Sequence, residues 1–344
     1  MNKRKELEMN SKALVNNKSW NGSLKALWKK ITLFRETTII FIIVVIGLIL
    51  TILSPHFLTT DNLMSIAVGL SGDGIVAVGM TIALVSGGFD LSVGSVTSFA
   101  GVIVGALYLA GVNIWIACLI AIVIGMLCGL ANGIFIGKIG LNPFITTLAI
   151  MGIARGGAYV LTQGYSISLF NVPKSFAFIG HGTILGLPFV VVVFILIASI
   201  GDFMMRKSEV LRKVLYTGSN EKAAVMSGIN ILKIKICVYV LLAFLASIAG
   251  ILVAARFNVA TPPTGSGAEL SIISISAAVI GGASLNGGEG TILGTVLGLI
   301  LLNLINNGLI ILNIPVYWQD LVNGIILIAA VTIDFLTHRN INKN

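Results

Sequence analysis

Long apolar runs, separated by short polar or glycine-rich segments, occupy most of the chain. A membrane-spanning helix needs about 20 predominantly apolar residues, and windows of about that length locate ten such runs. The predicted spans are residues 37–53, 62–85, 93–110, 114–135, 143–161, 187–204, 236–255, 269–283, 292–311 and 316–335. This pattern predicts an all-α, polytopic membrane protein with about ten transmembrane helices.

The composition supports a membrane protein and argues against a soluble one. The 344 residues are 56% hydrophobic and 10% charged, whereas soluble domains are about 25% charged. The net charge of +9 could indicate nucleic-acid binding, but the basic residues lie between or before the apolar runs. We therefore expect the lipid bilayer as the surroundings and no nucleic-acid partner.

The positions of Lys and Arg predict the orientation of the chain, because cytoplasmic loops carry an excess of these residues. If both termini are cytoplasmic, only Lys174 and Arg256 fall in outer loops and Arg155 falls within a span. All other Lys and Arg residues then face the cytoplasm. The expected organisation is a polar cytoplasmic tail at 1–36, a transmembrane permease domain at 37–336 with a basic cytoplasmic loop at 205–235, and a cytoplasmic tail at 337–344.

Signatures of catalysis and metal binding are weak. Ser71 lies in a short motif of intramembrane proteases, but a nucleophile needs a general base and no predicted span contains histidine. Lys138 lacks the neighbouring Ser or Thr and the spacing of a phosphate-binding loop. No Cys/His cluster has metal-ligand spacing. We expect no enzyme activity, no metal and no cofactor bound by this chain.

Two glycine-rich junctions interrupt the apolar pattern, and each joins two predicted spans. Each contains a glycine pair and one acidic residue: Gly87, Gly88 and Asp90 in residues 87–95, and Gly281, Gly282 and Glu289 in residues 281–291. Unwound backbone at membrane depth is tolerated beside protein or a watery cavity. The two junctions also resemble each other weakly, and internal duplication is common among transporters. We expect both at the cytoplasmic ends of their spans.

Polar residues inside the spans are candidates for the solute pathway, since ionisable groups are costly in a membrane. For Asp73, which lies between two glycines, we expect either a cavity-lining or helix-breaking role, or an interaction that holds two helices together. Arg155 pairs with an acid or donates hydrogen bonds to a polar solute. Asn303 and Asn307 lie four residues apart and share a helix face; their amides suit a hydroxylated solute or hydrogen bonding between helices.

The basic loop contains a segment, 218–229, in which small residues are followed by a glycine stop at Gly228. Its alanines favour a short, compact helix, and Gly228 fits a backbone angle or close approach that other residues disfavour. The span 114–135 and the residues just after it contain four glycines at helical spacing, which form a ridge that lets another helix approach closely. We interpret this ridge as a packing feature without a role in transport: Gly125, Gly129, Gly133 and Gly137.

Taken together, several motifs give the sequence its resemblance to a known family. They include 77–81, 87–95, 142–148, Ala223 and Ala224 with Gly228 and Ile229, 278–282 and 288–291. Over about residues 61–336 the chain resembles the membrane subunits of ribose-type sugar importers of the ATP-binding-cassette class. Relatives often carry an acid after the Glu-Leu pair that matches Glu269 and Leu270, whereas this chain has Ser271.

The resemblance implies a permease of the bacterial cytoplasmic membrane that moves a sugar or sugar-like solute. It implies three kinds of protein partner: ATP-binding-cassette ATPase subunits that use ATP, an extracytoplasmic solute-binding protein and a second permease chain, identical or paralogous. Its coupling segment would comprise Glu221, Ala223, Ala224, Gly228 and Ile229, which dock into the ATPase. With the polar residues above, the predicted pathway comprises Asp73, Asp90, Asn142, Phe144, Arg155, Asn303 and Asn307.

Two alternatives remain open at the level of function. The solute could be a nucleoside or a branched-chain amino acid instead of a sugar. A stand-alone, ion-coupled carrier is a further possibility, and it would transport without ATP.

Overall fold

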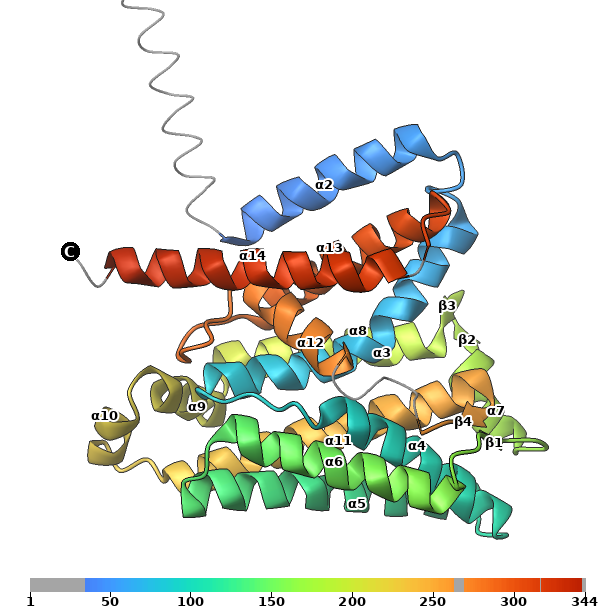
Figure 1. The fold of residues 1–344 in the computed structure, drawn as a ribbon, viewed down its shortest axis with the longest axis horizontal. Helices are drawn as coiled ribbons and strands as arrows, with labels where there is room; N and C mark the ends of the chain where they lie inside the picture. The colour runs from blue at the N-terminus through green and yellow to red at the C-terminus, as the bar shows by residue number, and fades with distance from the viewer. Residues whose placement is uncertain (1–34, 263–268, 316, 342–344) are drawn as a thin grey trace, which may run out of the picture.

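The protein, described by a computed structural model over residues 35–262, 269–315 and 317–341, is a bundle of helices (Figure 1). Each predicted span overlaps one helix. These helices are α2 (Arg35–Leu53), α3 (Thr60–Val85), α4 (Val93–Leu109), α5 (Ile114–Ile134), α6 (Pro143–Thr162), α8 (Phe189–Lys207), α11 (Ile231–Phe257), α12 (Glu269–Ile280), α13 (Ile292–Ile311) and α14 (Tyr317–Ile341). Residues 1–34 and 342–344, which belong to the two predicted tails, lie outside the described residues.

Seven helices among the described residues are long and apolar enough to cross a membrane: α2, α3, α5, α6, α8, α11 and α13. Helix α5 continues into a π-helical turn, η1 (Phe135–Ile139), which ends at Gly140 in the left-handed region. Helices α4 and α12 are shorter and apolar. The chain is therefore a polytopic membrane protein, as the sequence predicts.

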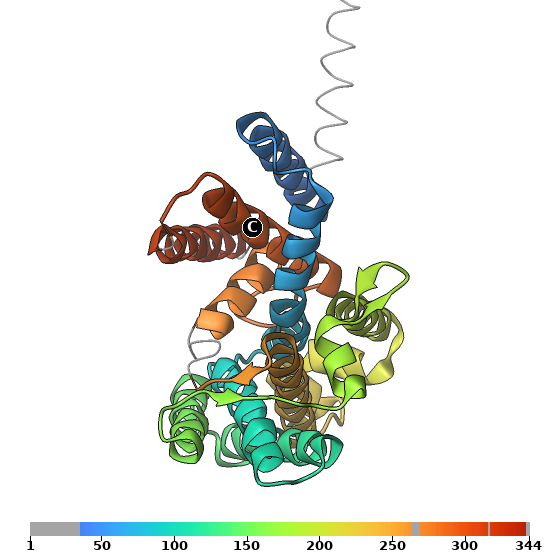
Figure 2. The ribbon, with the colours of Figure 1, turned by 90° about the vertical axis from the view of Figure 1, so that its right-hand side faces the viewer.

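Helix α11 lies at the centre of the bundle and packs against α3, α4 and α5 (Figures 1 and 2). The glycine ridge of α5 makes this approach possible. A methyl group on Gly129 would lie 2.7 Å from the Ala243 Cβ, and one on Gly133 would lie 2.7 Å from the Ile236 Cα. The ridge packs against another helix, as the packing interpretation predicts.

A second group of helices, α2, α12, α13 and α14, lies along the other side of α3 (Figures 1 and 2). Helix α12 crosses α13 closely, because a methyl group on Gly281 would lie 2.5 Å from the Thr295 backbone nitrogen. Helix α12 ends at Ile280, earlier than the predicted 283, because Gly282 adopts a φ of 96°.

The described chain is mostly helical, as predicted, and it also contains a few very short strands. Two antiparallel strand pairs are present, β1 (Ile167–Ser168) with β4 (Val259–Ala260) and β2 (Thr183–Ile184) with β3 (Leu187–Pro188). These pairs satisfy backbone groups in the connections between helices. They lie with the short helix α7 (Lys174–His181) at one end of the bundle, on the right in Figure 1.

The predicted loop 205–235 is also largely helical. It contains α9 (Glu209–Ser219), α10 (Glu221–Met226) and the first turn of α11. Helix α9 forms because its apolar side chains at helical spacing, Leu211 and Val214, are buried against the bundle. At the other end of the chain, α14 continues to Ile341, past the predicted boundary at 336, since no Pro or Gly interrupts residues 337–341.

Helices α9 and α10 lie at the left end of the bundle in Figure 1, opposite the strand pairs. The first turn of α2 and the last turn of α14 also lie toward that end. The bundle thus has one end with both described chain ends and helices α9 and α10, and another end with the strands and α7.

Candidate functional site

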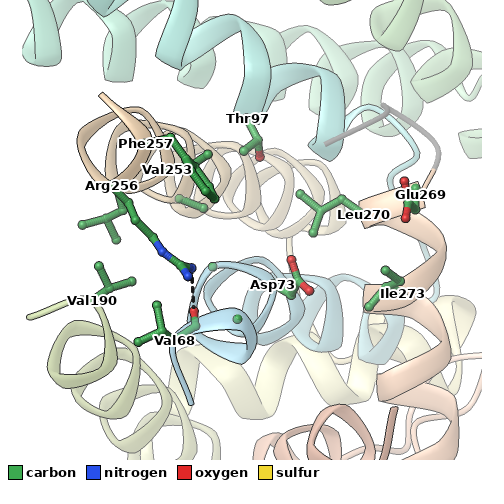
Figure 3. A pocket seen from close by; sticks show the side chains of 14 residues that line it. Val68, Asp73, Thr97, Val190, Val253, Arg256, Phe257, Glu269, Leu270 and Ile273 are labelled. Carbon is green, nitrogen blue, oxygen red and sulfur yellow. Dashed lines mark hydrogen bonds between the residues drawn. The ribbon is translucent and has the colours of Figure 1, made fainter. Parts of the chain in front are cut away.

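A cavity of about 430 Å³ lies among α3, α4, α8, α11 and α12 (Figure 3). Most of its walls are apolar, and they include Val68, Val190, Leu252, Val253, Leu270 and Ile273. Three charged side chains also line it: Asp73, Arg256 and Glu269. Among the predicted pathway residues, the structure places Asp73 in this cavity.

The three charged groups come from different helices. Asp73 lies in the middle of α3 between Gly72 and Gly74, which allow neighbouring helices to approach. Glu269 begins α12, where a carboxylate is favoured by the helix dipole. In Figure 3 both carboxylates lie on the side of the cavity near α12, and Arg256 approaches from the opposite side.

Arg256 belongs to the last turn of α11 and reaches toward α3. Its Nη1 donates a hydrogen bond to the Val68 carbonyl oxygen at 3.4 Å. Its guanidinium carbon lies 5.2 Å from the centre of the Phe257 ring, within range of a cation–π contact. These contacts hold a hydrogen-bond donor at the edge of the cavity.

The chemistry of the cavity suits binding more than catalysis. Carboxylates accept hydrogen bonds, the guanidinium donates them, and the apolar walls bind carbon–hydrogen surfaces. A hydroxylated solute can satisfy both kinds of polar group at once. Within the described part of the chain, no group of three His, Cys, Asp or Glu side chains could hold a metal ion.

Asp90 lies outside the cavity, buried at the first glycine-rich junction. Its carboxylate accepts hydrogen bonds from the Ser92 backbone N–H at 2.7 Å, from the Ser92 hydroxyl at 2.5 Å and from the Asn132 Nδ2 at 3.0 Å. These contacts fix the chain at the start of α4. The geometry supports a structural role at the junction and gives no direct contact with the cavity.

The two glycine-rich junctions, nearly two hundred residues apart in sequence, meet in space. The Gly288 backbone N–H donates to the Val85 carbonyl oxygen at 2.9 Å. A methyl group on Gly287 would lie 2.7 Å from the Gly87 Cα. Gly87 and Gly287 have φ values of 82° and 85°, which glycine adopts more readily than other residues.

The first junction does not stay at one end of the bundle. It leaves the end of α3 near α9 and reaches α12, where the Ser271 hydroxyl donates to the Leu91 carbonyl oxygen at 2.9 Å. Ser271 is buried beside Leu270 of the cavity wall. The expectation that this junction lies wholly at the cytoplasmic ends of its spans is therefore too simple, because the short helix α4 begins deep in the bundle.

Helices α3 and α13 are joined by a pair of amides. The Asn62 Nδ2 donates to the Asn307 Oδ1 at 3.1 Å, and the Asn307 Nδ2 donates to the Asn62 Oδ1 at 2.8 Å. Asn303 donates to the Leu299 carbonyl oxygen within its own helix at 3.2 Å. This arrangement favours helix pairing for Asn307, and neither amide lines the cavity.

The remaining pathway candidates lie on α6, at the edge of the bundle in Figure 2. Asn142 caps this helix by accepting a hydrogen bond from the Phe144 backbone N–H at 2.8 Å. Phe144 and Arg155 are exposed in the isolated chain, and the Arg155 guanidinium carbon lies 5.8 Å from the centre of the Tyr159 ring. The structure does not bring these residues to the cavity.

The predicted coupling segment forms the short helix that the sequence indicates. Asn220 caps α10 by accepting from the Ala223 backbone N–H at 3.0 Å, and Ala224 is buried. The Ile229 backbone N–H donates to the Ala224 carbonyl oxygen at 3.0 Å, which closes the helix. Gly228 has a φ of 78° and open space around it, so the predicted special backbone angle is confirmed and close approach within this chain is not.

Glu221 also contacts the first part of α11. Its Oε1 lies 3.0 Å from the Lys235 Nζ. This surface ion pair links α10 to the central helix, although exposed pairs of this kind contribute little to stability.

Sequence reasoning missed Arg256 as a cavity residue. It falls one residue beyond the predicted span 236–255 and was assigned to an outer loop, whereas α11 continues to Phe257. A basic residue next to an aromatic one at the end of a long span, followed by Glu269 at the start of the next, is a signal that could have indicated it.

The comparisons with known proteins agree with this architecture. The family described as the branched-chain amino acid transport system, permease component, matches residues 62–331. The ribose import permease protein RbsC of Escherichia coli strain K12 is 36% identical over 307 residues, which cover 89% of this chain and 95% of that protein. No solved structure matches this chain.

Two further relatives carry related names. RbsC of Bacillus subtilis strain 168 is 35% identical, covering 86% of this chain and 90% of that protein. The L-arabinose transport system permease protein AraH of E. coli strain K12 is 35% identical, covering 92% of this chain and 95% of that protein. The chain is thus a transport permease by class, and it belongs to the family of branched-chain amino acid transport system permease components.

Proposed function

We propose that this chain is the membrane-spanning permease subunit of an ATP-binding-cassette importer that moves a sugar or sugar-like solute across the cytoplasmic membrane. The observation that carries the proposal is the cavity, which presents two carboxylates and a guanidinium inside a bundle of apolar helices. The names of the ribose and L-arabinose permeases support a sugar as the solute.

The charged groups suggest how a solute is recognised. Sugar hydroxyls donate to Asp73 and Glu269 and accept from Arg256, while the apolar walls contact the ring carbons. Charged hydrogen bonds are about twice as strong as neutral ones, but a permease must also release its cargo. The exposed positions of Glu269 and Phe257 suit a site that stays accessible from one side.

The proposed topology has ten spans with both termini in the cytoplasm, and a domain division at 1–36, 37–336 and 337–344. It puts α9 and α10 inside and the strand pairs outside. ATP-binding-cassette ATPase subunits would dock on α10 through Glu221, Ala223, Ala224, Gly228 and Ile229, and a solute-binding protein would dock on the opposite end. ATP is used by the ATPase partner and not by this chain.

A second permease chain completes the proposed complex. Arg155 in the middle of α6 faces outward, and charged groups in membranes usually face protein or a watery path. A second chain opposite α6 would provide such surroundings. Pathway roles for Phe144 and Arg155 depend on this arrangement.

Vesicle uptake tests the proposal. Proteoliposomes containing this chain, its ATPase subunits and its solute-binding protein should accumulate labelled ribose or arabinose when ATP is supplied on the ATPase side. Vesicles with this chain alone should not. Uptake by the chain alone would indicate an ion-coupled carrier instead.

One observation favours a second candidate solute. The cavity also suits a branched-chain amino acid. Its carboxylate would pair with Arg256, its ammonium group would pair with Asp73, and its side chain would contact the branched aliphatic side chains of the walls. Excess leucine would then abolish the uptake of labelled sugar or would itself be taken up. Uptake of sugar that is unaffected by leucine supports the sugar.

A further inference from the structure

Three distant segments of the chain meet at one point, mainly through backbone atoms, with the Ser219 side chain next to Gly288. They are the end of α3 with Gly87, the end of α9 with Gly218, and the second junction with Gly287 and Gly288. A methyl group on Gly218 would lie 2.7 Å from the Gly288 backbone nitrogen and 2.9 Å from the Val85 carbonyl carbon. These distances are too short for any side chain at Gly218.

Gly287 and Gly288 of the second junction approach the end of α9 equally closely. A methyl group on Gly288 would lie 2.7 Å from the Ser219 Cα, and one on Gly287 would lie 2.9 Å from the Gly218 carbonyl oxygen. The Gly288 N–H also donates to the Val85 carbonyl oxygen at 2.9 Å. We call residues 85–87, 218–219 and 287–288 the backbone contact.

A contact between backbones differs mechanically from one between side chains. Side chains can absorb a small displacement by changing rotamer, whereas packed backbones must move together or separate. A displacement of the end of α9 is therefore passed to both junctions at once.

Both junctions lead to the cavity. Helix α3 runs from the backbone contact at Val85 to Asp73, twelve residues or about 18 Å along the helix. The first junction continues from Gly87 to Leu91, whose carbonyl oxygen accepts from Ser271 next to Leu270 of the cavity wall. The second junction follows directly after α12, which begins with Glu269.

We infer that the backbone contact transmits movement of α9 and α10 to the cavity, by shifting the α3 wall and the α12 wall together. Gly87, Gly218, Gly287 and Gly288 are its positioning residues. The inference rests on the proposed function, because ATP-driven movement of α10 is its source. It goes further by assigning the path between the ATPase-facing helices and the solute cavity.

The substitution Gly218→Ala tests the inference in the assembled complex of this chain with its ATPase subunits and solute-binding protein. The matched control is Gly47→Ala on α2, where an added methyl group meets nothing within 4 Å. Gly218→Ala should lower ATP-driven uptake and the stimulation of ATP hydrolysis by loaded binding protein at least tenfold. Because the added methyl group overlaps backbone atoms of Val85 and Gly288, the melting temperature in detergent should also fall. Uptake and stimulation are therefore compared with the control at equal amounts of assembled complex.

Hydrogen–deuterium exchange of the wild-type complex provides a measurement that needs no variant. Adding a non-hydrolysable ATP analogue should change exchange in 209–219, 85–92 and 284–291 together. If exchange changes in 209–226 and stays constant in both junctions, the inference is wrong. Wild-type uptake by Gly218→Ala would overturn it as well, whereas a wild-type complex that takes up no solute would contradict the proposed function itself.

Discussion

At the scale of single residues, Asp90 shows how a buried carboxylate organises a break between two membrane helices. Three donors from Ser92 and Asn132 converge on it, and one of them is a backbone N–H at the start of α4. The sequence identifies Asp90 as the one acid of the first glycine-rich junction. It does not predict Asn132, which lies on another helix and is brought there by packing.

Replacing Asp90 tests this role. Asp90→Asn keeps one acceptor oxygen and should leave expression near the wild-type level. Asp90→Leu leaves the buried Ser92 N–H without its acceptor, at about 1–3 kcal/mol, and leaves the Asn132 Nδ2 with the Ser92 hydroxyl oxygen as its remaining acceptor at 3.1 Å. It should abolish most transport. Expression in membranes and uptake by the complex are the measurements. Equal uptake by Asp90→Leu and the wild type would show that the junction does not need the carboxylate.

The amide pair of Asn62 and Asn307 predicts an energetic coupling between α3 and α13. Hydrogen bonds between membrane helices contribute about 0.6 kcal/mol on average and up to about 1.7 kcal/mol. A double-mutant cycle of Asn62→Ala and Asn307→Ala, measured by unfolding in detergent, should give a coupling in that range. Pairing Asn62→Ala with Asn303→Ala is the control, and it should give none, because Asn303 donates to its own helix. Additive effects of Asn62→Ala and Asn307→Ala would argue against the pair.

Residue types alone identified part of the candidate site. Asp73 stands out because an acid in an apolar span is costly, and the structure places it in the cavity. Arg256 did not stand out, because its place in the cavity depends on how far α11 extends and on the position of Val68 in α3. A role that depends on contacts between distant helices cannot be obtained from spacing along one of them.

At the scale of helices, the glycine ridge of α5 predicts a marked difference between two glycine positions. A side chain on Gly129 would overlap the Tyr239 backbone of α11, whereas one on Gly152 of α6 meets nothing within 4 Å. Gly129→Val should therefore lower the yield and melting temperature of the protein in detergent, and Gly152→Val should change them little. Similar values for the two variants would contradict the close packing of α5 on α11.

Helix α10 gives a test of docking by the ATPase. Gly228→Glu adds bulk and charge beyond the end of α10, outside the predicted membrane region, so membrane insertion should be normal. Uptake and solute-stimulated ATP hydrolysis should be lost. Gly228→Asn is the matched variant, because Asn tolerates the left-handed backbone at a φ of 78°, and it should retain most uptake. Wild-type uptake by Gly228→Glu would indicate that this segment is only a linker.

Most elements follow from the apolar pattern, because a run of about 20 apolar residues has few structures available in a membrane. The apolar pattern fails where contacts between distant segments of the chain, rather than the local sequence, determine the structure. The apolar pattern predicts a loop where α9 lies, since the polar residues of α9 outnumber the apolar side chains that are buried against the bundle. The strand pair of β1 with β4 joins segments about ninety residues apart and has no local signal.

At the scale of the whole molecule, the two glycine-rich junctions connect the end of the bundle that carries α9 and α10 with the cavity. Their weak likeness in sequence suggested duplication, and the structure adds that they pack against each other. The proposed importer requires a place for the solute and a surface for the ATPase, and in our proposal these are the cavity and helices α9 and α10. The backbone contact provides a physical connection between them.

The most direct test of this account is the initial rate of sugar uptake by the assembled complex at increasing concentrations of loaded binding protein, for wild type and Asp73→Asn. Asp202→Asn on α8 is the matched control, because Asp202 pairs with Arg206 away from the cavity. We predict ATP-dependent uptake of ribose or arabinose by wild type and Asp202→Asn, and a loss of at least tenfold for Asp73→Asn at equal complex assembly. Equal uptake by all three proteins would contradict a solute path through the cavity.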